Sequence, residues 1–232
     1  MIQTVLFDLD NTLLFKKPTL SEKIYELALQ AQPDLKFEAV QKAYAASEIW
    51  QGAQIKKENE TGVRMSDEEY LGNLVRIYKE HISFLPTDEA RLQKILMQEY
   101  DKEYCLSPHA QETLQYLKGK GVTLGIVSNN YSKIRQVLAD LGIAELFDTI
   151  VISEEVGLYK PDPKILEYAC AQLNTPCNAS IYVGDHPFDI LCAHSAGMPA
   201  VWMPENPFMT VPEEIGPAEH IIRSLNELSK IL

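Results

Sequence analysis

Close to its N-terminus the chain reads Val5-Leu6-Phe7-Asp8-Leu9-Asp10-Asn11-Thr12. Residues 4–7 are apolar, β-branched or aromatic, which predicts a buried strand. A buried strand has no structural need for acids, yet Asp8 and Asp10 follow it directly. Because side chains alternate along a strand, both carboxylates should point to the same face, roughly 6–7 Å apart at their Cα atoms.

This pair of acids has two interpretations. Two like charges so close to each other repel, unless one is protonated or a cation lies between them. That arrangement suits catalysis, with one carboxylate as nucleophile, the other as general acid and base, and a hard cation held by oxygens. The alternative is a turn over residues 8–12 whose Asx side chains bond the backbone. The stretch alone does not decide between the two.

The composition is that of a globular protein, with 46% hydrophobic and 23% charged residues among 232. The formal net charge of −12 and the lack of a basic stripe argue against nucleic acid as a partner. No apolar run approaches the roughly 20 residues of a membrane span, so we expect no membrane partner. An anionic ligand would have to meet a local positive charge, supplied by a lysine, a metal ion or backbone N–H groups.

The cysteines and the N-terminus predict a cytoplasmic protein. The N-terminus carries acids at once and no basic region, which argues against a signal peptide. The four cysteines form no C-x-x-C pair and are too scattered for a disulfide framework, so we expect reduced thiols at Cys105, Cys170, Cys177 and Cys192.

A long insertion follows the opening stretch. From residue 19 to about residue 104, apolar residues recur at helical intervals with almost no strand signal. Ser66-Asp67-Glu68-Glu69 is a capping box that begins one helix, and Thr87 begins another. The pattern predicts roughly four helices packed as a small bundle. We expect two short non-helical segments, residues 15–18 and 104–107, to be its hinges and its only connections to the rest of the chain.

Beyond residue 107, helices and strands alternate. Ser107 and Pro108 predict the start of a helix that Gly121 ends. Strands are predicted at 122–127, 149–152, 180–183 and 200–203, and helices at 132–141, 163–173 and 188–196. Strands joined by crossover helices predict a parallel, doubly wound sheet, which gives the opening strand its partners. Residues 1–14 and 107–232 should form this α/β core, with residues 15–106 inserted, a proline-containing loop over 203–218 and a final helix over 224–232.

Polar residues stand where several of these strands end, and ligands of open parallel sheets bind at the carboxyl ends of strands. A hydroxyl and backbone N–H groups can bind phosphate oxygens, a lysine can neutralise them, and acids can hold a hard cation. Four of these residues also have a local interpretation: a turn or N-cap for Ser128, a solvated surface side chain for Lys160, a helix cap for Asp185, and a charge that complements the helix dipole for Asp189. The residues concerned are Ser128, Asn129, Lys160, Asp185 and Asp189.

In this order the residues resemble the motifs of the haloacid dehalogenase-like (HAD) hydrolases. The resemblance runs from about residue 3 to residue 203, and none of the family's core positions is missing. It implies a Rossmann-like parallel sheet with an inserted helical cap, called C1, over residues 15–106. The first to fourth motifs are matched by Asp8-Leu9-Asp10-Asn11-Thr12-Leu13, by Ser128, by Lys160-Pro161, and by Gly184-Asp185 with Asp189.

The resemblance also implies roles for these residues. Asp8 would be the nucleophile that becomes phosphorylated, and Asp10 the general acid and base. Ser128 and the Asn129 backbone would bind the transferring phosphoryl group, and Lys160 would neutralise it. Mg²⁺ would be held by the Asp8 carboxylate, the Asp10 backbone carbonyl and Asp185, with Asp189 in or near the second shell.

The expected function is Mg²⁺-dependent hydrolysis of a small phosphate monoester through an aspartyl-phosphate. One alternative is a haloacid dehalogenase of the same family, which would use Asp8 without a metal. Those enzymes do not keep an acid at the second position, where this chain has Asp10. A phosphomutase, which returns the phosphoryl group to a second hydroxyl, is another alternative, and a catalytically silent binding module is a third.

The sequence identifies neither the substrate nor the oligomeric state. In the family the cap and its entry loop choose the substrate, and a cap favours a small phosphorylated metabolite over a phosphoprotein. Sugar phosphates, nucleoside monophosphates and small acid phosphates are all candidates. The insertion residues that could contact it, each equally explained by a solvated helix face or a packed aromatic, are Phe15, Lys16, Lys17, Trp50, Lys56, Lys57 and Arg64.

Overall fold

The computed structural model describes residues 2–232, which form two compact units. The α/β unit comprises the chain up to Phe15, Tyr104–Glu205 and Thr210–Leu232. The helical unit comprises Lys16–Glu103 and Asn206–Met209. No helix among the described residues is long and apolar enough to span a membrane.

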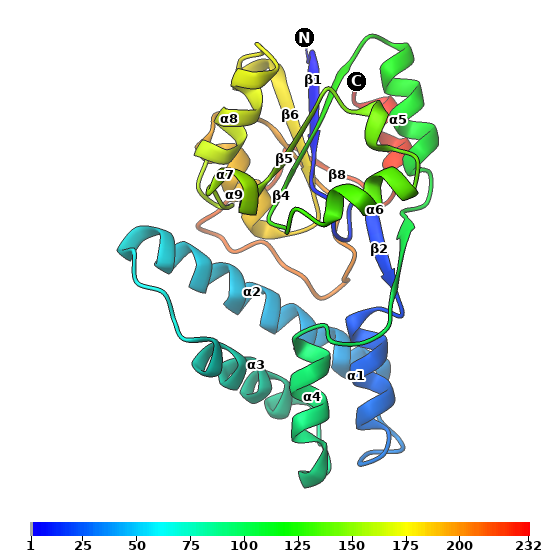
Figure 1. Cartoon of the computed structure of the whole chain (residues 1–232), viewed down its shortest axis with the longest axis vertical. Coiled ribbons are helices and arrows are strands. Elements are labelled where there is room, and N and C mark those ends of the chain that lie inside the picture. Colours follow the sequence, from blue (N-terminus) through cyan, green and yellow to red (C-terminus); the bar gives the residue numbers. More distant parts are fainter. Residues whose placement is uncertain (1) are drawn as a thin grey trace. The chain divides into compact units, whose positions relative to one another are not determined.

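A six-stranded parallel sheet forms the centre of the α/β unit (Figure 1). The strand order is β5-β4-β1-β6-β7-β8. The order reverses at β1, because the chain passes first to β4 on one side of it and later to β6 on the other. The predicted α/β fold with a Rossmann-like parallel sheet is confirmed. The strands are β1 (Thr4–Phe7), β4 (Thr123–Ser128), β5 (Thr149–Ile152), β6 (Ser180–Gly184), β7 (Ala200–Trp202) and β8 (His220–Ile221).

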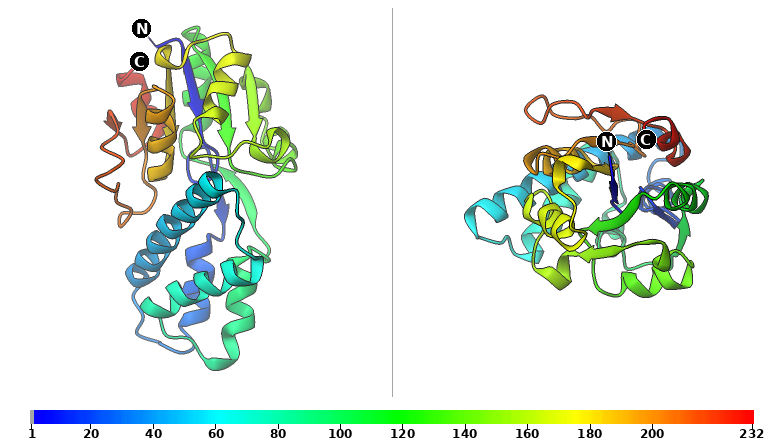
Figure 2. Two further views of the ribbon diagram at one scale, coloured as in Figure 1. Left: turned by 90° about the vertical axis from the view of Figure 1, so that its left-hand side faces the viewer. Right: turned by 90° about the horizontal axis from the view of Figure 1, so that it is seen from above.

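Helices cover both faces of this sheet, as the view from above shows (Figure 2). The alternation of side chains along β1 sorts its residues between two apolar layers. Val5 and Phe7 pack with α5 and α6, whereas Leu6 packs with α8 and α9. The helices are α5 (Ala110–Gly119), α6 (Ile134–Asp140), α7 (Ser153–Val156), α8 (Lys164–Gln172) and α9 (Pro187–Ser195).

The helical unit has one apolar core, to which all four of its α-helices contribute. Ser66 begins α3 as predicted, since its side chain accepts a hydrogen bond from the Glu69 N–H at 3.2 Å. A capping box that the sequence did not suggest, Thr19 with Glu22, begins α1. The helices are α1 (Leu20–Ala28), α2 (Phe37–Thr61), α3 (Asp67–His81) and α4 (Glu89–Leu96).

The connections between the two units differ from the prediction. The expected hinges contain strands, β2 (Leu14–Lys17) and β3 (Glu103–Leu106), which pair as a two-stranded sheet. The prediction that these are the only connections is wrong, because Asn206–Met209 also belongs to the helical unit. Asn206 is 5% exposed and donates to the Gln41 carbonyl oxygen at 2.7 Å. A buried amide needs such a partner, and this one fixes the middle of the proline-containing loop.

One predicted helix start is wrong in detail, and the helix predicted at the end of the chain is present. Ser107 does not cap a helix that starts at Pro108, because its N–H donates to the Leu13 carbonyl oxygen and its own carbonyl accepts from Ala110. The chain turns through His109, whose φ is 64°, before α5 begins. The final helix predicted over 224–232 is present as a 3₁₀ helix over Leu225–Lys230, with Ser224 as its N-cap.

Candidate active site

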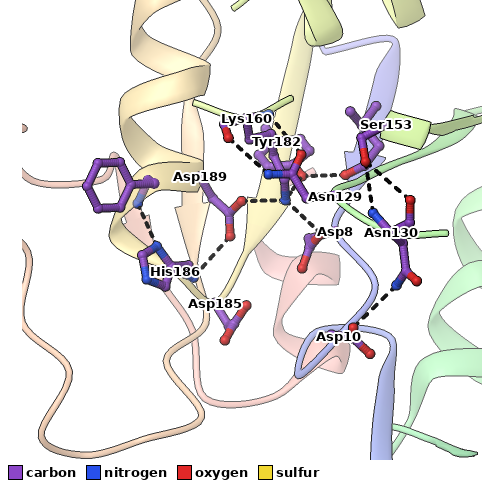
Figure 3. Close-up of polar contacts among 12 residues, drawn as sticks. Asp8, Asp10, Asn129, Asn130, Ser153, Lys160, Tyr182, Asp185, His186 and Asp189 are labelled. Atoms are coloured by element: carbon purple, nitrogen blue, oxygen red, sulfur yellow. Dashed lines mark hydrogen bonds and ion pairs between the residues drawn. The ribbon is translucent and has the colours of Figure 1, made fainter. Parts of the chain in front are cut away.

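The polar residues singled out in the sequence gather where β1, β4 and β6 end (Figure 3). Asp8 follows β1, Ser128 is the last residue of β4, and Asp185 follows β6. Asp189 projects from the first turn of α9. This is the edge at which a doubly wound sheet presents its ligand-binding groups.

Lys160 is the centre of the arrangement. Its ammonium donates to Asp8 Oδ1 and Asp189 Oδ1, both at 2.7 Å, and to the Tyr182 hydroxyl at 2.9 Å. The residue is only 7% exposed, so the interpretation of it as a solvated loop side chain is wrong. An ammonium has three N–H donors, and all three are used here.

The backbone of Lys160 is fixed as firmly as its side chain. The Asn129 amide donates to the Lys160 carbonyl at 2.9 Å and accepts from the Lys160 N–H at 2.8 Å. The resemblance implies a role for the backbone of Asn129, and the structure gives its side chain one as well. The side chain ties the end of β4 to the segment that carries the lysine.

The buried charges perturb one another. Burial, together with repulsion from Asp189 and Asp10, raises the pKa of Asp8 to about 6, although the Lys160 ammonium opposes this. Burial alone would lower the pKa of Lys160, but the carboxylates of Asp189 and Asp8 raise it well above its ordinary value. The lysine is therefore charged near neutral pH, and Asp8 is largely ionised above about pH 6.

Three carboxylates, those of Asp8, Asp185 and Asp189, have ligand oxygens within 4.8 Å of one another. All-oxygen donor sets of this kind suit Mg²⁺, so the residues present fit a hard divalent cation. Asp185 also accepts from the Asn11 side chain at 3.3 Å. The two oxygens of Asp189 accept from Lys160 and from the His186 N–H.

Asp10 lies apart from this cluster. Its Oδ2 accepts from the Asn130 side chain at 3.3 Å. Asn130 is held in turn by Ser153, whose hydroxyl accepts from the Asn130 N–H at 3.0 Å and donates to its carbonyl at 3.2 Å. The metal role implied for Asp10 concerns its backbone carbonyl, so the position of its side chain does not bear on that role.

The start of α9 depends on local sequence. His186, not Asp185, is its N-cap: the ring nitrogen Nδ1 accepts from the Phe188 N–H at 3.1 Å, and Asp189 closes the capping box. The interpretation of Asp185 as a cap is therefore wrong, which leaves its carboxylate in the acidic cluster. Gly184 permits the close approach of Asp189, because a Cβ there would lie 2.3 Å from Asp189 Oδ2.

Sequence reasoning missed Tyr182 and Ser153. Tyr182 stands inside an otherwise apolar strand, where an aromatic residue predicts only packing. The substrate-contact candidates of the insertion also have local partners. Trp50 packs on Tyr70 at 5.2 Å between ring centroids, and Lys16 donates to Gln98 at 3.0 Å.

Comparisons with known proteins relate the chain to one family of hydrolases. The model of the haloacid dehalogenase-like hydrolase family matches residues 5–203. The ribulose-1,5-bisphosphate 5-phosphatase of Halopiger xanaduensis is 28% identical over the full length of both chains. The (S)-2-haloacid dehalogenase 4A of Burkholderia cepacia is 32% identical over 62% of each chain. The magnesium-bound HAD-hydrolase YfnB of Bacillus subtilis superposes with a TM-score of 0.66 at 25% identity, covering 100% of this chain and 98% of that one.

Proposed function

The chain belongs to the haloacid dehalogenase-like hydrolases, and from this we propose that it hydrolyses a small phosphate monoester with Mg²⁺ through an aspartyl-phosphate on Asp8. The observation that carries the proposal is the buried ion cluster in which Lys160 contacts both Asp8 and Asp189. A carboxylate oxygen of Asp185 lies within 4.8 Å of oxygens of those two residues. A lysine beside a carboxylate nucleophile and a set of oxygen ligands suits the transfer of a dianionic phosphoryl group. The helical unit is proposed to act as the cap.

Asp8 attacks phosphorus in this mechanism, and the bond from phosphorus to the leaving oxygen breaks. Lys160 faces the charge of the phosphoryl oxygens, together with the Ser128 hydroxyl and the Asn129 N–H. Mg²⁺, held by Asp8, the Asp10 carbonyl and Asp185, would supply further charge neutralisation when bound.

Asp10 is proposed to move the protons. It gives one to the leaving alkoxide and then takes one from the water that cleaves the acyl phosphate of Asp8. The hydrogen bond from Asn130 orients the carboxylate for both steps. A haloacid dehalogenase would need no proton from Asp10 for the first step, because a halide leaves without one, although water must still cleave the ester formed on Asp8.

The dehalogenase is the second candidate, favoured by the relative from Burkholderia cepacia. The ion cluster argues for the phosphatase, since displacement of a halide needs no oxygen ligands for a cation. The substrate class is proposed to be a small phosphorylated metabolite, and the phosphatase from Halopiger xanaduensis makes sugar phosphates the first to test.

A hydrolysis screen tests the proposal. Phosphate release from sugar phosphates, nucleoside monophosphates and small acid phosphates is measured with Mg²⁺ and with excess chelator, and halide release from 2-haloacids is measured alongside. We expect phosphate release that requires the cation and is absent in Asp8→Asn. Halide release that persists in chelator, without phosphate release, would favour the dehalogenase instead.

A further inference from the structure

We infer that Tyr182 is a positioning residue, whose hydroxyl aims the Lys160 ammonium at the reacting phosphoryl group; this rests on the function proposed above. The alternative is that Tyr182 only fills the core. Tyr182 lies in β6 and is fully buried. Its ring belongs to the apolar layer that also contains Leu6 and Ile190, while its hydroxyl reaches the polar cluster (Figure 3).

The direction of each hydrogen bond at Tyr182 follows from the chemistry of its partners. The Val127 carbonyl, 2.7 Å from the hydroxyl, can only accept, so the tyrosine proton points to it. A lone pair of the same oxygen is then left to accept from Lys160 Nζ at 2.9 Å. The hydroxyl cannot rotate freely, because each of its two partners permits one role only.

The hydrogen bond from Tyr182 to Val127 links two strands that are not neighbours in the sheet. Tyr182 is on β6 and Val127 on β4, and β1 lies between those strands in the sheet. Val127 directly precedes Ser128 and Asn129, the proposed phosphoryl-binding residues. One hydroxyl therefore ties the lysine to the strand end from which the phosphoryl group would be bound.

The hydrogen bond between Lys160 and Tyr182 matters more after Asp8 is phosphorylated than before. Asp8 loses its charge when it forms the acyl phosphate, so its bond to Lys160 cannot hold the ammonium through the whole cycle. Asp189 and Tyr182 do not change during that step and remain as the fixed partners. With the contacts to Asp189 and Tyr182 in place, the third N–H of Lys160 can point only toward Asp8 or the phosphoryl group attached to it.

Removal of the hydroxyl should leave a buried N–H of Lys160 and the Val127 carbonyl without that partner. At metal sites, hydrogen-bond partners that orient a ligand are worth about 10- to 100-fold in activity, and we take the same scale for the partner of Lys160. We therefore expect Tyr182→Phe to lower kcat by about 10- to 100-fold, with KM changed by less than about threefold. A residue that merely packs would keep its packing in phenylalanine and lose little.

The matched control is Tyr78→Phe. Tyr78 is also fully buried and bonds one side chain, Ser47, at 3.4 Å, but it lies in the core of the helical unit. Both variants lose a buried hydroxyl, and Tyr182→Phe should lose more folding stability, because it removes two shorter hydrogen bonds, one of them to an ammonium group. Only Tyr182→Phe should lose kcat toward an aryl phosphate. If its kcat stays within about twofold of the unchanged protein, the inference is wrong.

A second measurement works without turnover. The Lys160 ammonium is buried with three partners, so its protons should exchange slowly with water and give an ¹⁵N-detected NMR signal near neutral pH. Lys160→Arg assigns that signal. We expect rapid exchange in Tyr182→Phe and slow exchange in Tyr78→Phe. If the Lys160 protons exchange equally fast in Tyr182→Phe and Tyr78→Phe, the positioning role is wrong. If they exchange slowly in the unchanged protein but that protein releases no phosphate, only the proposed function is wrong.

Discussion

Asp8→Asn should stabilise the metal-free protein at neutral pH while it abolishes turnover. The fold raises the pKa of Asp8 from 3.8 to about 6. At about 1.36 kcal/mol for each pKa unit, ionised Asp8 lowers the free energy of unfolding by about 3 kcal/mol. Asparagine keeps the shape of the side chain without the charge. Turnover should be lost because the proposed nucleophile is then an amide, which is far less nucleophilic than a carboxylate.

The sign of this effect gives it a characteristic pH dependence. A carboxyl group whose pKa is raised in the folded state favours folding below its unfolded pKa of 3.8, and this contribution is lost as pH rises to about 6. The free energy of unfolding of Asp8→Asn should therefore exceed that of the unchanged protein only slightly near pH 4, and by roughly 3 kcal/mol near pH 7. Chemical denaturation of both proteins in chelator, followed at several pH values, measures it.

Asp148→Asn supplies a control of opposite sign. Partial burial alone would raise the pKa of Asp148, but hydrogen bonds from Lys118 and from the Leu124 N–H lower it. That carboxylate favours folding at neutral pH, and its contribution is lost as pH falls through the lowered pKa, so its removal should destabilise the protein at pH 7. A difference between Asp8→Asn and the unchanged protein that does not vary with pH would refute the reasoning, and so would a loss of stability at neutral pH.

Three further substitutions test other side chains of the structure. Lys160→Met should abolish turnover and lower the free energy of unfolding by about 3–5 kcal/mol at neutral pH, because it leaves buried carboxylates unpaired; denaturation curves measure this. Asp10→Asn should accumulate phosphorylated protein from an aryl phosphate, seen as added mass on the peptide containing Asp8, and a label elsewhere would contradict the assigned roles. Asn206→Ala should lower the free energy of unfolding by about 1–3 kcal/mol, because the bond to the Gln41 carbonyl is buried, and an unchanged midpoint would show that this contact contributes little.

The sequence predicts the sheet well because its signals are local. The residues from Thr4 to Phe7 are β-branched, apolar or aromatic, and all four are buried. Lys160 could not be placed in the same way. A lysine before a proline predicts an exposed loop, and its burial depends on Asp8, which is 152 residues away in the chain. The same holds for Asn206, whose carbonyl partner is 165 residues distant.

Lys160 explains how the chain can bury several acids together. Asp8 and Asp189 are each less than 10% exposed, and two unpaired carboxylates so deep in the protein would resist ionising. The ammonium between them permits ionisation without removing all of the negative charge. When ionised, the three carboxylates of the cluster against one ammonium leave two negative charges. A phosphate dianion would be repelled by that excess, and a divalent cation would cancel it. The acids thus suit a divalent cation, which would in turn let the site accept the proposed anionic substrate.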